Sequence, residues 1–224
     1  GLPSFPKPEE YRPPILSEVY TQDAVLAGEF YNERRKVVPY ERIPKRLVQA
    51  FIAAEDADFF DHFGIDVFGT SRAVFKTVMK KVTGAGKVQG GSTLTQQTAK
   101  AVLISTEGYK ESTAKTIKRK IREALLARRL ESELKKEEIL YLYLNNVYLG
   151  HHSYGVQSAA ENYYRKDVKD LTLAEMALLA GLPQAPSAFS PFTQPEKARK
   201  RRQYVLGQML QKGMISKIEH DEAA

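Results

Sequence analysis

Apolar side chains recur at helical spacing directly after Pro44, a residue suited to the first turn of a helix. The pattern is carried by Leu47, Val48, Phe51 and Ile52. It predicts a helix that turns one face toward the core and ends at Glu55. The chain then enters the ten-residue stretch EDADFFDHFG, residues 55–64, where two adjacent carboxylates meet aromatic side chains. We interpret this stretch as the centre of the chain's organisation.

Further apolar periodicities predict that the chain after Pro44 is helical throughout. The expected helices lie, in chain order, near residues 92–104, 113–131, 137–149, 154–164, 173–180 and 194–212. A hydroxyl residue with a glutamate three positions later predicts a capping box at a helix start. Such pairs are Thr172 with Glu175, Thr193 with Glu196, and Ser216 with Glu219. The expected fold class is therefore mainly α.

The N-terminal part of the chain has a different character. Residues 3–14 hold five prolines, which predicts an extended linker. Between residues 17 and 38, short apolar runs separated by polar turn residues predict short strands or a hairpin. We therefore expect a linker with a small β element over residues 1–40 and one helical domain over residues 41–224.

Composition narrows the class of partner. The 224 residues carry a formal charge of +7, which favours an anionic partner such as nucleic acid, a phosphorylated substrate or an anionic membrane surface. Cysteine is absent from the sequence, which excludes disulfides and thiolate metal sites. No apolar run approaches the roughly 20 residues of a membrane-spanning helix. Because the chain starts at Gly1 and its last cap opens a new helix, we interpret it as a piece of a longer protein.

Glu55 is the first candidate for chemistry. The negative end of a helix dipole and the flanking Phe59, Phe60 and Phe63 disfavour an ionised carboxylate, so we expect a raised proton affinity suited to a general base. His62 adds a second titratable group to the stretch. The alternative is a solvated Glu55–Asp56 pair that only ends a helix, as most surface carboxylates do.

The stretch QGGSTLTQQTAK, residues 89–100, is the second candidate. Two glycines followed by Ser92 and Thr93 predict a helix start with a hydroxyl cap and open access to the backbone. Such an end suits phosphate, and Lys100 lies two turns further along. An ordinary helix cap without a ligand is the alternative.

A second basic helix is expected over residues 113–131. We expect its core face to consist of Ile117, Ile121, Ala124 and Leu125. Glu123 lies on another face with Arg119 and Lys120, four and three residues before it, and more cations are present than one glutamate needs. A surface salt bridge is the alternative interpretation.

The segment from Ile65 to Val82 is amphipathic, with apolar residues on one side and Arg72 with three lysines on the other. Phe68, Phe75 and Met79 belong to its apolar face. Core packing and contact with a membrane surface both fit this pattern. Further on, Asn145 and Asn146 fall in a helix that is apolar nearly all round, so we expect their amides to find partners.

Four motifs in order resemble one family. They are EDADFFDHFG at 55–64, GGSTLTQQ at 90–97, RKIRE at 119–123 and YLNNVYLG at 143–150, extended by AEMALLAGLPQAPS at 174–187. With these motifs the chain resembles the peptidoglycan glycosyltransferases of glycosyltransferase family 51, the first catalytic domain of class A penicillin-binding proteins. The resemblance implies a lysozyme-like helical domain with a smaller membrane-proximal lobe. It also implies a membrane anchor upstream and a transpeptidase domain downstream.

The resemblance implies polymerisation of lipid II into β-1,4 glycan strands with inversion and release of polyprenyl pyrophosphate. The implied catalytic residues are Glu55 as base and Glu123. The implied substrate-binding residues are Asp56, His62, Arg72, Ser92, Thr93, Gln96, Gln97, Lys100, Lys115, Arg119, Lys120 and Asn145. No cofactor is expected to be obligatory, although Mg²⁺ or Mn²⁺ could assist at the pyrophosphate.

The implied partners are lipid II, the growing glycan strand, a bacterial membrane and moenomycin-type inhibitors. The implied location is the outer face of the bacterial cytoplasmic membrane, in a protein with a single-pass anchor. A lysozyme-like muramidase or lytic transglycosylase is the main alternative, because a lone helix-end glutamate also suits that chemistry. The surplus of cations favours a pyrophosphate substrate instead. A nucleic-acid-binding module is a second alternative, and no groove-reading motif supports it.

Overall fold

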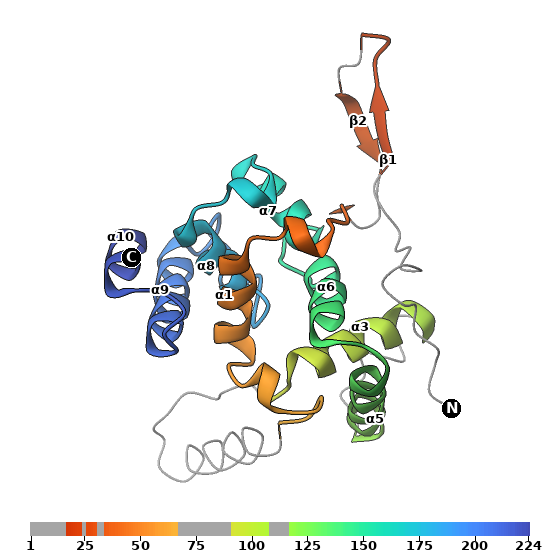
Figure 1. Cartoon of the computed structure of the whole chain (residues 1–224). Helices are drawn as coiled ribbons and strands as arrows, with labels where there is room; N and C mark the ends of the chain where they lie inside the picture. Colours follow the sequence, from red (N-terminus) through yellow and green to blue (C-terminus); the bar gives the residue numbers. More distant parts are fainter. Residues whose placement is uncertain (1–16, 24–25, 31–33, 67–90, 108–116) are drawn as a thin grey trace. The chain divides into compact units, whose positions relative to one another are not determined.

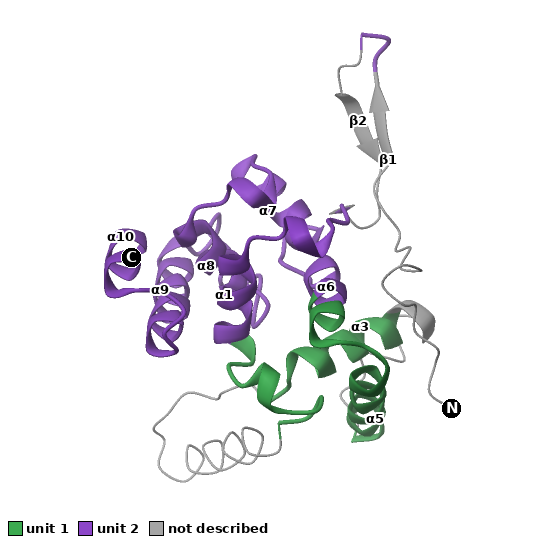
Figure 2. Ribbon diagram, in the orientation of Figure 1, with its two compact units in different colours: residues 1–5, 55–140 green, residues 6–54, 141–224 purple. Residues whose placement is uncertain are grey.

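The computed structural model describes residues 17–23, 26–30, 34–66, 91–107 and 117–224. Helices dominate this part of the chain, which confirms the predicted fold class (Figure 1). The chain divides into two compact units, one of residues 1–5 and 55–140 and the other of residues 6–54 and 141–224 (Figure 2). The boundary expected at residue 40 stays a prediction.

The first unit is built around two helices that pack together, α3 (Leu94–Glu107) and α5 (Ile117–Glu133). It also holds the last residue of α1 (Lys45–Glu55), the short helix η3 (Phe59–Asp61) and the first residues of α6 (Lys136–Asn146). Its largest fully buried side chains are Phe59, Leu94, Leu103, Leu126, Leu130, Ile139 and Leu140. This apolar core fixes α3 and α5 against each other, and both helices carry predicted site residues.

Among its described residues, the second unit contains most of α1, the part of α6 from Tyr141 to Asn146 and four complete helices, of which α8 and α9 make the most extensive contact. They are α7 (Val156–Tyr164), α8 (Leu173–Gly181), α9 (Pro195–Gln211) and α10 (Lys217–Ala223). Short 3-10 turns lie at η2 (Tyr40–Arg42) and η4 (Val168–Asp170). Completely buried side chains of this unit include Leu47, Phe51, Leu144, Leu179, Val205, Leu206 and Met209.

The predicted N-terminal hairpin is confirmed. Strand β1 (Ser17–Tyr20) pairs antiparallel with β2 (Leu26–Phe30), with Ser17 opposite Phe30. A second, two-residue pair was not predicted: β3 (Arg34–Arg35) runs parallel to β4 (Ser153–Tyr154). The expectation that everything after Pro44 is helical is therefore wrong at β4. Two residues carry too little alternation to be recognised as a strand in a sequence.

Two of the three predicted capping boxes are present. Thr172 with Glu175 and Ser216 with Glu219 each form both reciprocal hydrogen bonds. The third prediction is wrong, because α9 starts with Pro195 after Gln194 and has no side-chain cap. Proline needs no partner for a backbone N–H and presets the helical φ, which favours this position at the helix start.

The predicted inner face of α5 is also wrong. Ile117, Ile121 and Leu125 are 82%, 55% and 55% exposed, whereas Glu123 is only 1% exposed. The face that points into the core combines Glu123 with Leu126, Ala127 and Leu130. A buried carboxylate is tolerated there because two cations pair with it. The buried face of α5 is therefore the one that carries Glu123, and the predicted aliphatic face points outward.

Several predictions fall on parts of the chain outside the described residues. These are Arg72, Lys115 and nearly all of the amphipathic segment from Ile65 to Val82, including Phe68, Phe75 and Met79. Within the described ranges, no helix is both long enough and apolar enough to cross a lipid bilayer.

Candidate active site

Glu55 is the last residue of α1 and is partly buried. The side-chain amide of Gln97, in the first turns of α3, donates a hydrogen bond to its carboxylate with 3.0 Å between Nε2 and Oε2. A donor at this position fixes the direction of one carboxylate oxygen. Glu55 is therefore held next to α3 by a side chain that comes from the second predicted motif.

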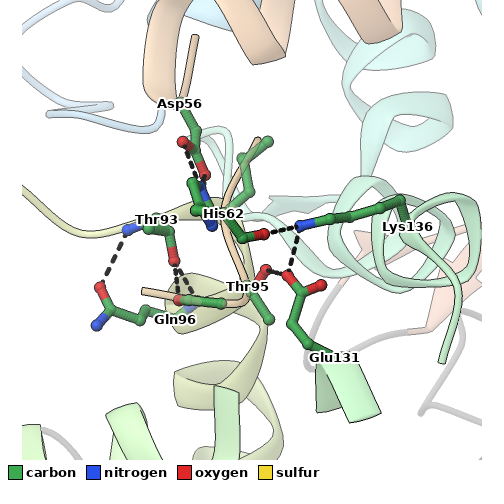
Figure 3. Close-up of polar contacts among 9 residues, drawn as sticks. Asp56, His62, Thr93, Thr95, Gln96, Glu131 and Lys136 are labelled. Atoms are coloured by element: carbon green, nitrogen blue, oxygen red, sulfur yellow. Dashed lines mark hydrogen bonds and ion pairs between the residues drawn. The ribbon is translucent and has the colours of Figure 1, made fainter. Parts of the chain in front are cut away.

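Asp56, directly after Glu55, joins the loop of residues 56–64 to the start of α3 (Figure 3). Its carboxylate is buried and accepts a hydrogen bond of 2.9 Å from the backbone N–H of Leu94. Nε2 of His62 lies 2.9 Å from one oxygen of this carboxylate and 3.1 Å from the other. A carboxylate at a helix N-terminus is favoured by the helix dipole. Asp56 thus caps α3 and fixes the position of His62.

Thr93 makes a second link between the loop and α3. Its hydroxyl donates to the carbonyl of Gly64 at 2.6 Å and accepts the N–H of Gln96 at 3.1 Å. The amide oxygen of Gln96 in turn accepts the N–H of Thr93 at 3.0 Å. Gly64 has φ +79°, and a Cβ there would lie 2.9 Å from the carbonyl oxygen of Ala127. Only glycine fits this contact between the loop and α5.

Glu123 is the second carboxylate of the site. Its Oε1 lies 3.0 Å from Nε of Arg119, and its Oε2 lies 2.8 Å from Nζ of Lys120. Both contacts are ion pairs by distance, although neither has the alignment of a hydrogen bond. The ammonium of Lys120 also donates to the hydroxyl of Ser92 at 3.0 Å. One buried anion therefore holds two cations, and one of them reaches the residue before Thr93.

The structure brings most of the predicted site residues into the first unit. Besides the pairs just described, Lys100 is exposed on α3. Asn145 belongs to the second unit, where its amide is buried and forms two hydrogen bonds with the backbone of Val38. It accepts the Val38 N–H at 2.9 Å and donates to the Val38 carbonyl at 3.1 Å. Its amide therefore has the backbone partners expected for a buried side chain, and a role in substrate binding stays a prediction.

The expected aromatic surroundings of Glu55 are only partly present. Phe59 is fully buried, but Phe60 and Phe63 are 58% and 70% exposed, so their expected packing around the acidic pair is wrong. Phe59 and Phe60 are neighbours in the short helix η3 and point in different directions, so only Phe59 turns inward, and Phe63 lies beyond the end of η3.

Three residues of this region were missed by the sequence reasoning: Thr95, Glu131 and Lys136. They form a connected polar group beside the loop of residues 56–64 (Figure 3). Thr95 lies inside the motif GGSTLTQQ but was not singled out there, and Glu131 and Lys136 lie outside the four motifs. For these two, the signal in the sequence was a glutamate at the expected end of one helix, followed five residues later by a lysine.

Metal binding has limited support in these residues. Among the described residues, there is no group of three or more His, Asp or Glu placed to hold a metal ion. Asp56 is occupied by His62 and the start of α3, and Glu123 by its two cations. The described side chains therefore do not form a resident metal centre, and assistance by Mg²⁺ or Mn²⁺ stays a prediction.

A pair of carboxylates suits acid–base chemistry at a glycosidic bond, and paired cations suit an anionic group. The family model described as Transglycosylase matches residues 23–210 of the chain. The chain therefore belongs to the Transglycosylase family, and the resemblance based on the four motifs is confirmed.

Individual relatives agree with this assignment. The chain is 45% identical over 223 residues to penicillin-binding protein 1A of Neisseria flavescens and 44% identical to that of Haemophilus influenzae. These alignments cover 99% and 100% of the chain, but the chain spans only about a quarter of the length of these relatives, 26% and 25%. The crystal structure of penicillin-binding protein 1A from Haemophilus influenzae is similar with a TM-score of 0.52 and 30% identity. That match covers 94% of this chain and 20% of the other.

Proposed function

We propose that the chain is a peptidoglycan glycosyltransferase that polymerises lipid II into β-1,4 glycan strands with inversion and releases polyprenyl pyrophosphate. The observation that carries this proposal is the attachment of both carboxylates to the start of α3. Glu55 is attached through Gln97, and Glu123 through Lys120 and Ser92. One helix start thus lies between a candidate base and a pair of cations. Membership in the Transglycosylase family and the similarity to penicillin-binding proteins 1A support it.

Glu55 takes the proton in this mechanism. A bond forms between the acceptor's 4-hydroxyl oxygen and the anomeric carbon of the donor, while the bond from that carbon to the pyrophosphate oxygen breaks. The hydroxyl proton goes to Glu55, and the electron pair of the broken bond goes to the pyrophosphate. Attack opposite the leaving group inverts the anomeric carbon, so no covalent glycosyl-enzyme is needed. Gln97 keeps the carboxylate turned toward α3.

Arg119 and Lys120 stabilise the leaving pyrophosphate as its negative charge grows. Their attachment to Glu123 holds them in place before substrate arrives, which lowers the cost of arranging them in the transition state. Lys120 is half exposed, so its ammonium is accessible to a ligand. Lys100 adds a further exposed cation on α3, and Lys115 and Arg72 are proposed from the motif resemblance alone.

The alternative is a lysozyme-like muramidase or lytic transglycosylase, in which Glu55 would act as an acid on an uncharged glycosidic bond. Cleavage of such a bond has no use for cations that stabilise a pyrophosphate. The ion-paired Arg119 and Lys120 beside Ser92 therefore favour glycosyl transfer.

The proposed substrate also defines the partners and the location. Lipid II and the growing glycan strand are the reactants, and moenomycin-type phosphoglycolipids would compete for the same cations. Because lipid II is anchored in a bilayer, the site works at a bacterial membrane, on the outer face of the cytoplasmic membrane where cell wall is assembled. Nucleic acid is not among the proposed partners.

The test is to supply labelled lipid II and to separate the products by size. Longer glycan is expected from the parent protein, and shortening of preformed glycan would instead support the hydrolase. Glu55→Gln keeps the shape of the side chain but removes the proton acceptor, so polymerisation should fall by roughly 10²- to 10⁴-fold. Asp61→Asn is the matched control, because Asp61 is an exposed carboxylate of the same loop and should leave the rate unchanged. More than about a tenth of the parental rate in Glu55→Gln would refute the base role.

A further inference from the structure

A buried ionic group lies behind the loop that follows Glu55. The carboxylate of Glu131, on α5, accepts a hydrogen bond of 2.6 Å from the hydroxyl of Thr95, on α3, and pairs with the ammonium of Lys136, on α6, at 2.8 Å. The side chains of Glu131 and Lys136 are 4% and 18% exposed. We call these three residues the brace (Figure 3).

The brace also holds the loop itself. The ammonium of Lys136 donates to the carbonyl oxygen of His62 at 2.6 Å and lies 4.3 Å from the centre of the Phe59 ring. A cation over an aromatic face is attracted to it, and the attraction is stronger away from water. Lys136 is therefore occupied by a carboxylate, a backbone carbonyl and an aromatic ring, and the last two belong to residues 56–64.

Neither charge of the brace suits its own helix. Lys136 is the first residue of α6, where the helix dipole disfavours a cation. Glu131 lies two residues before the end of α5, where the dipole disfavours an anion. Replacing a buried ion pair by apolar side chains is often neutral or stabilising for folding. Neither the helix dipoles nor the burial of two charges explains why an ion pair stands here. Its contacts across three segments of the chain offer an explanation.

Those contacts converge on the two partners of one hydrogen bond. The loop held by Lys136 starts directly after Glu55. The helix held through Thr95 also carries Gln97, two residues after Thr95, and Gln97 donates a hydrogen bond to Glu55. One ion pair thus fixes Glu55 and its donor relative to each other. Asp56 makes a separate link between the loop and Leu94, so the fold does not depend on the brace alone.

We infer that Glu131 and Lys136 are positioning residues that hold the Glu55 carboxylate in the orientation needed to accept a proton. This inference rests on the proposed function, because it concerns the same base. The brace acts through the backbone of His62 and through Thr95, and it touches neither substrate. It predicts that loosening the brace lowers the turnover rate without weakening substrate binding. A misplacement of about 1 Å at a reacting group can cost on the order of 100-fold in rate.

The decisive variant is the apolar pair Lys136→Met with Glu131→Leu, which keeps the volume of both side chains and removes both charges together. No buried charge is left unpaired, but the Thr95 hydroxyl and the His62 carbonyl lose a partner, so the melting temperature should fall by about a few degrees while the protein stays folded. Its kcat with lipid II should fall by about 10- to 100-fold, with KM within about twofold of the parent. Arg129→Met is the matched control, since Arg129 forms an exposed ion pair with Glu133 on the same helix and should not change kcat.

A second variant and a second readout keep the result clear if the apolar pair fails to fold. Glu131→Gln retains the shape and an acceptor for Thr95 but loses the charge, and it should show the same loss of kcat at unchanged KM. Hydrogen exchange at the backbone amides of Leu94 and Gln97 should be faster in both variants, and this measurement needs no activity. Parental kcat in a folded variant, or unchanged exchange, would overturn the inference.

Glu55→Gln, measured in parallel, separates this inference from the proposed function. If the parent forms no polymer, or if Glu55→Gln keeps the parental rate, then the proposed function fails, whatever the exchange data show for the brace. If Glu55→Gln is inactive while the brace variants turn over at the parental rate, only the brace inference fails. A KM that rises together with falling kcat would assign the brace to substrate binding and would also contradict it.

Discussion

Lys120→Ala tests how the cations of the site divide between stability and donor binding. In the structure, the Lys120 ammonium pairs with Glu123 at 2.8 Å and donates to Ser92 at 3.0 Å, while 51% of the side chain is exposed. Removal of Lys120 leaves Glu123 with Arg119 at 3.0 Å, so the buried carboxylate keeps one partner. Stability should therefore change little, whereas a cation proposed to bind the pyrophosphate is lost.

The two magnitudes follow from these contacts. A hydrogen bond to a charged group contributes about 1.5–3 kcal/mol when protected, and exposed ion pairs contribute about 0–1 kcal/mol. For half-exposed Lys120 we expect a loss of about 1 kcal/mol, which lowers the melting temperature of a chain of this size by roughly 2–4 °C. Loss of a charge-assisted contact to phosphate should weaken donor binding by about 10- to 100-fold, which is about 1.4–2.8 kcal/mol.

The assay is a titration with a lipid-linked pyrophosphate or with moenomycin, run beside a thermal melt of each protein. Lys118→Ala is the control, because Lys118 is an exposed lysine of the same helix and its removal changes the net charge equally. Its affinity should stay near that of the parent. Equal affinity of Lys120→Ala and the parent would remove Lys120 from the donor site. A melting temperature lower by 10 °C or so, far beyond the expected few degrees, would show that Lys120 is mainly structural.

Three further predictions concern other parts of the chain. Glu123→Gln should destabilise the fold toward the lower end of the roughly 3–5 kcal/mol typical of a broken buried pair, and it should also slow polymerisation; unchanged melting and turnover would support a simple salt bridge. Burial raises the pKa of Glu175, but hydrogen bonds from Lys166 and Thr172 outweigh burial and lower this pKa below 4.5. The resulting stability is complete above about pH 4.5 and is lost as the pH falls below it, so Lys166→Met should flatten the acid limb of an unfolding-versus-pH curve. Replacing Phe68, Phe75 and Met79 together by serine should abolish binding to anionic vesicles, measured by sedimentation, while helical circular dichroism stays unchanged; a loss of helical signal would show that this face belongs to the core.

The elements with strong local signals could be predicted from the sequence. Pro44 and the apolar spacing after it predicted α1 up to Glu55. The capping boxes at Thr172 and Ser216, where the first helical residue is not proline, formed as expected. The start of α3 was recognised from its hydroxyl residues, although the sequence did not reveal that Thr93 and Asp56 share the capping. The caps at Thr172 and Ser216 depend on a glutamate three residues away, so the sequence shows them, whereas Asp56 lies 38 positions before Leu94 and its part in capping α3 depends on the tertiary fold.

The inner face of α5 could not be predicted, because the helix carries two apolar stripes. The longer one, with Ile117, Ile121 and Leu125, lies outward, and the shorter one is buried together with Glu123. The choice depends on ion pairs and on packing with α3, which are tertiary contacts. The brace was missed for the same reason, since the residues that Lys136 and Glu131 contact lie up to 74 positions away.

The shared start of α3 has a consequence for how substitutions combine. The candidate base is attached there through Gln97, and the cation pair through Ser92. A small shift of this helix end would displace the proposed base and the proposed leaving-group cations together, so substitutions at the two carboxylates should not have independent effects. Residues coupled through one element show interaction energies of about 0.5–3 kcal/mol in double-mutant cycles. A change of acceptor or donor specificity would therefore require coordinated substitutions on both sides of the helix end. A single substitution on the way to such a change would weaken both the proposed base and the proposed cation pair.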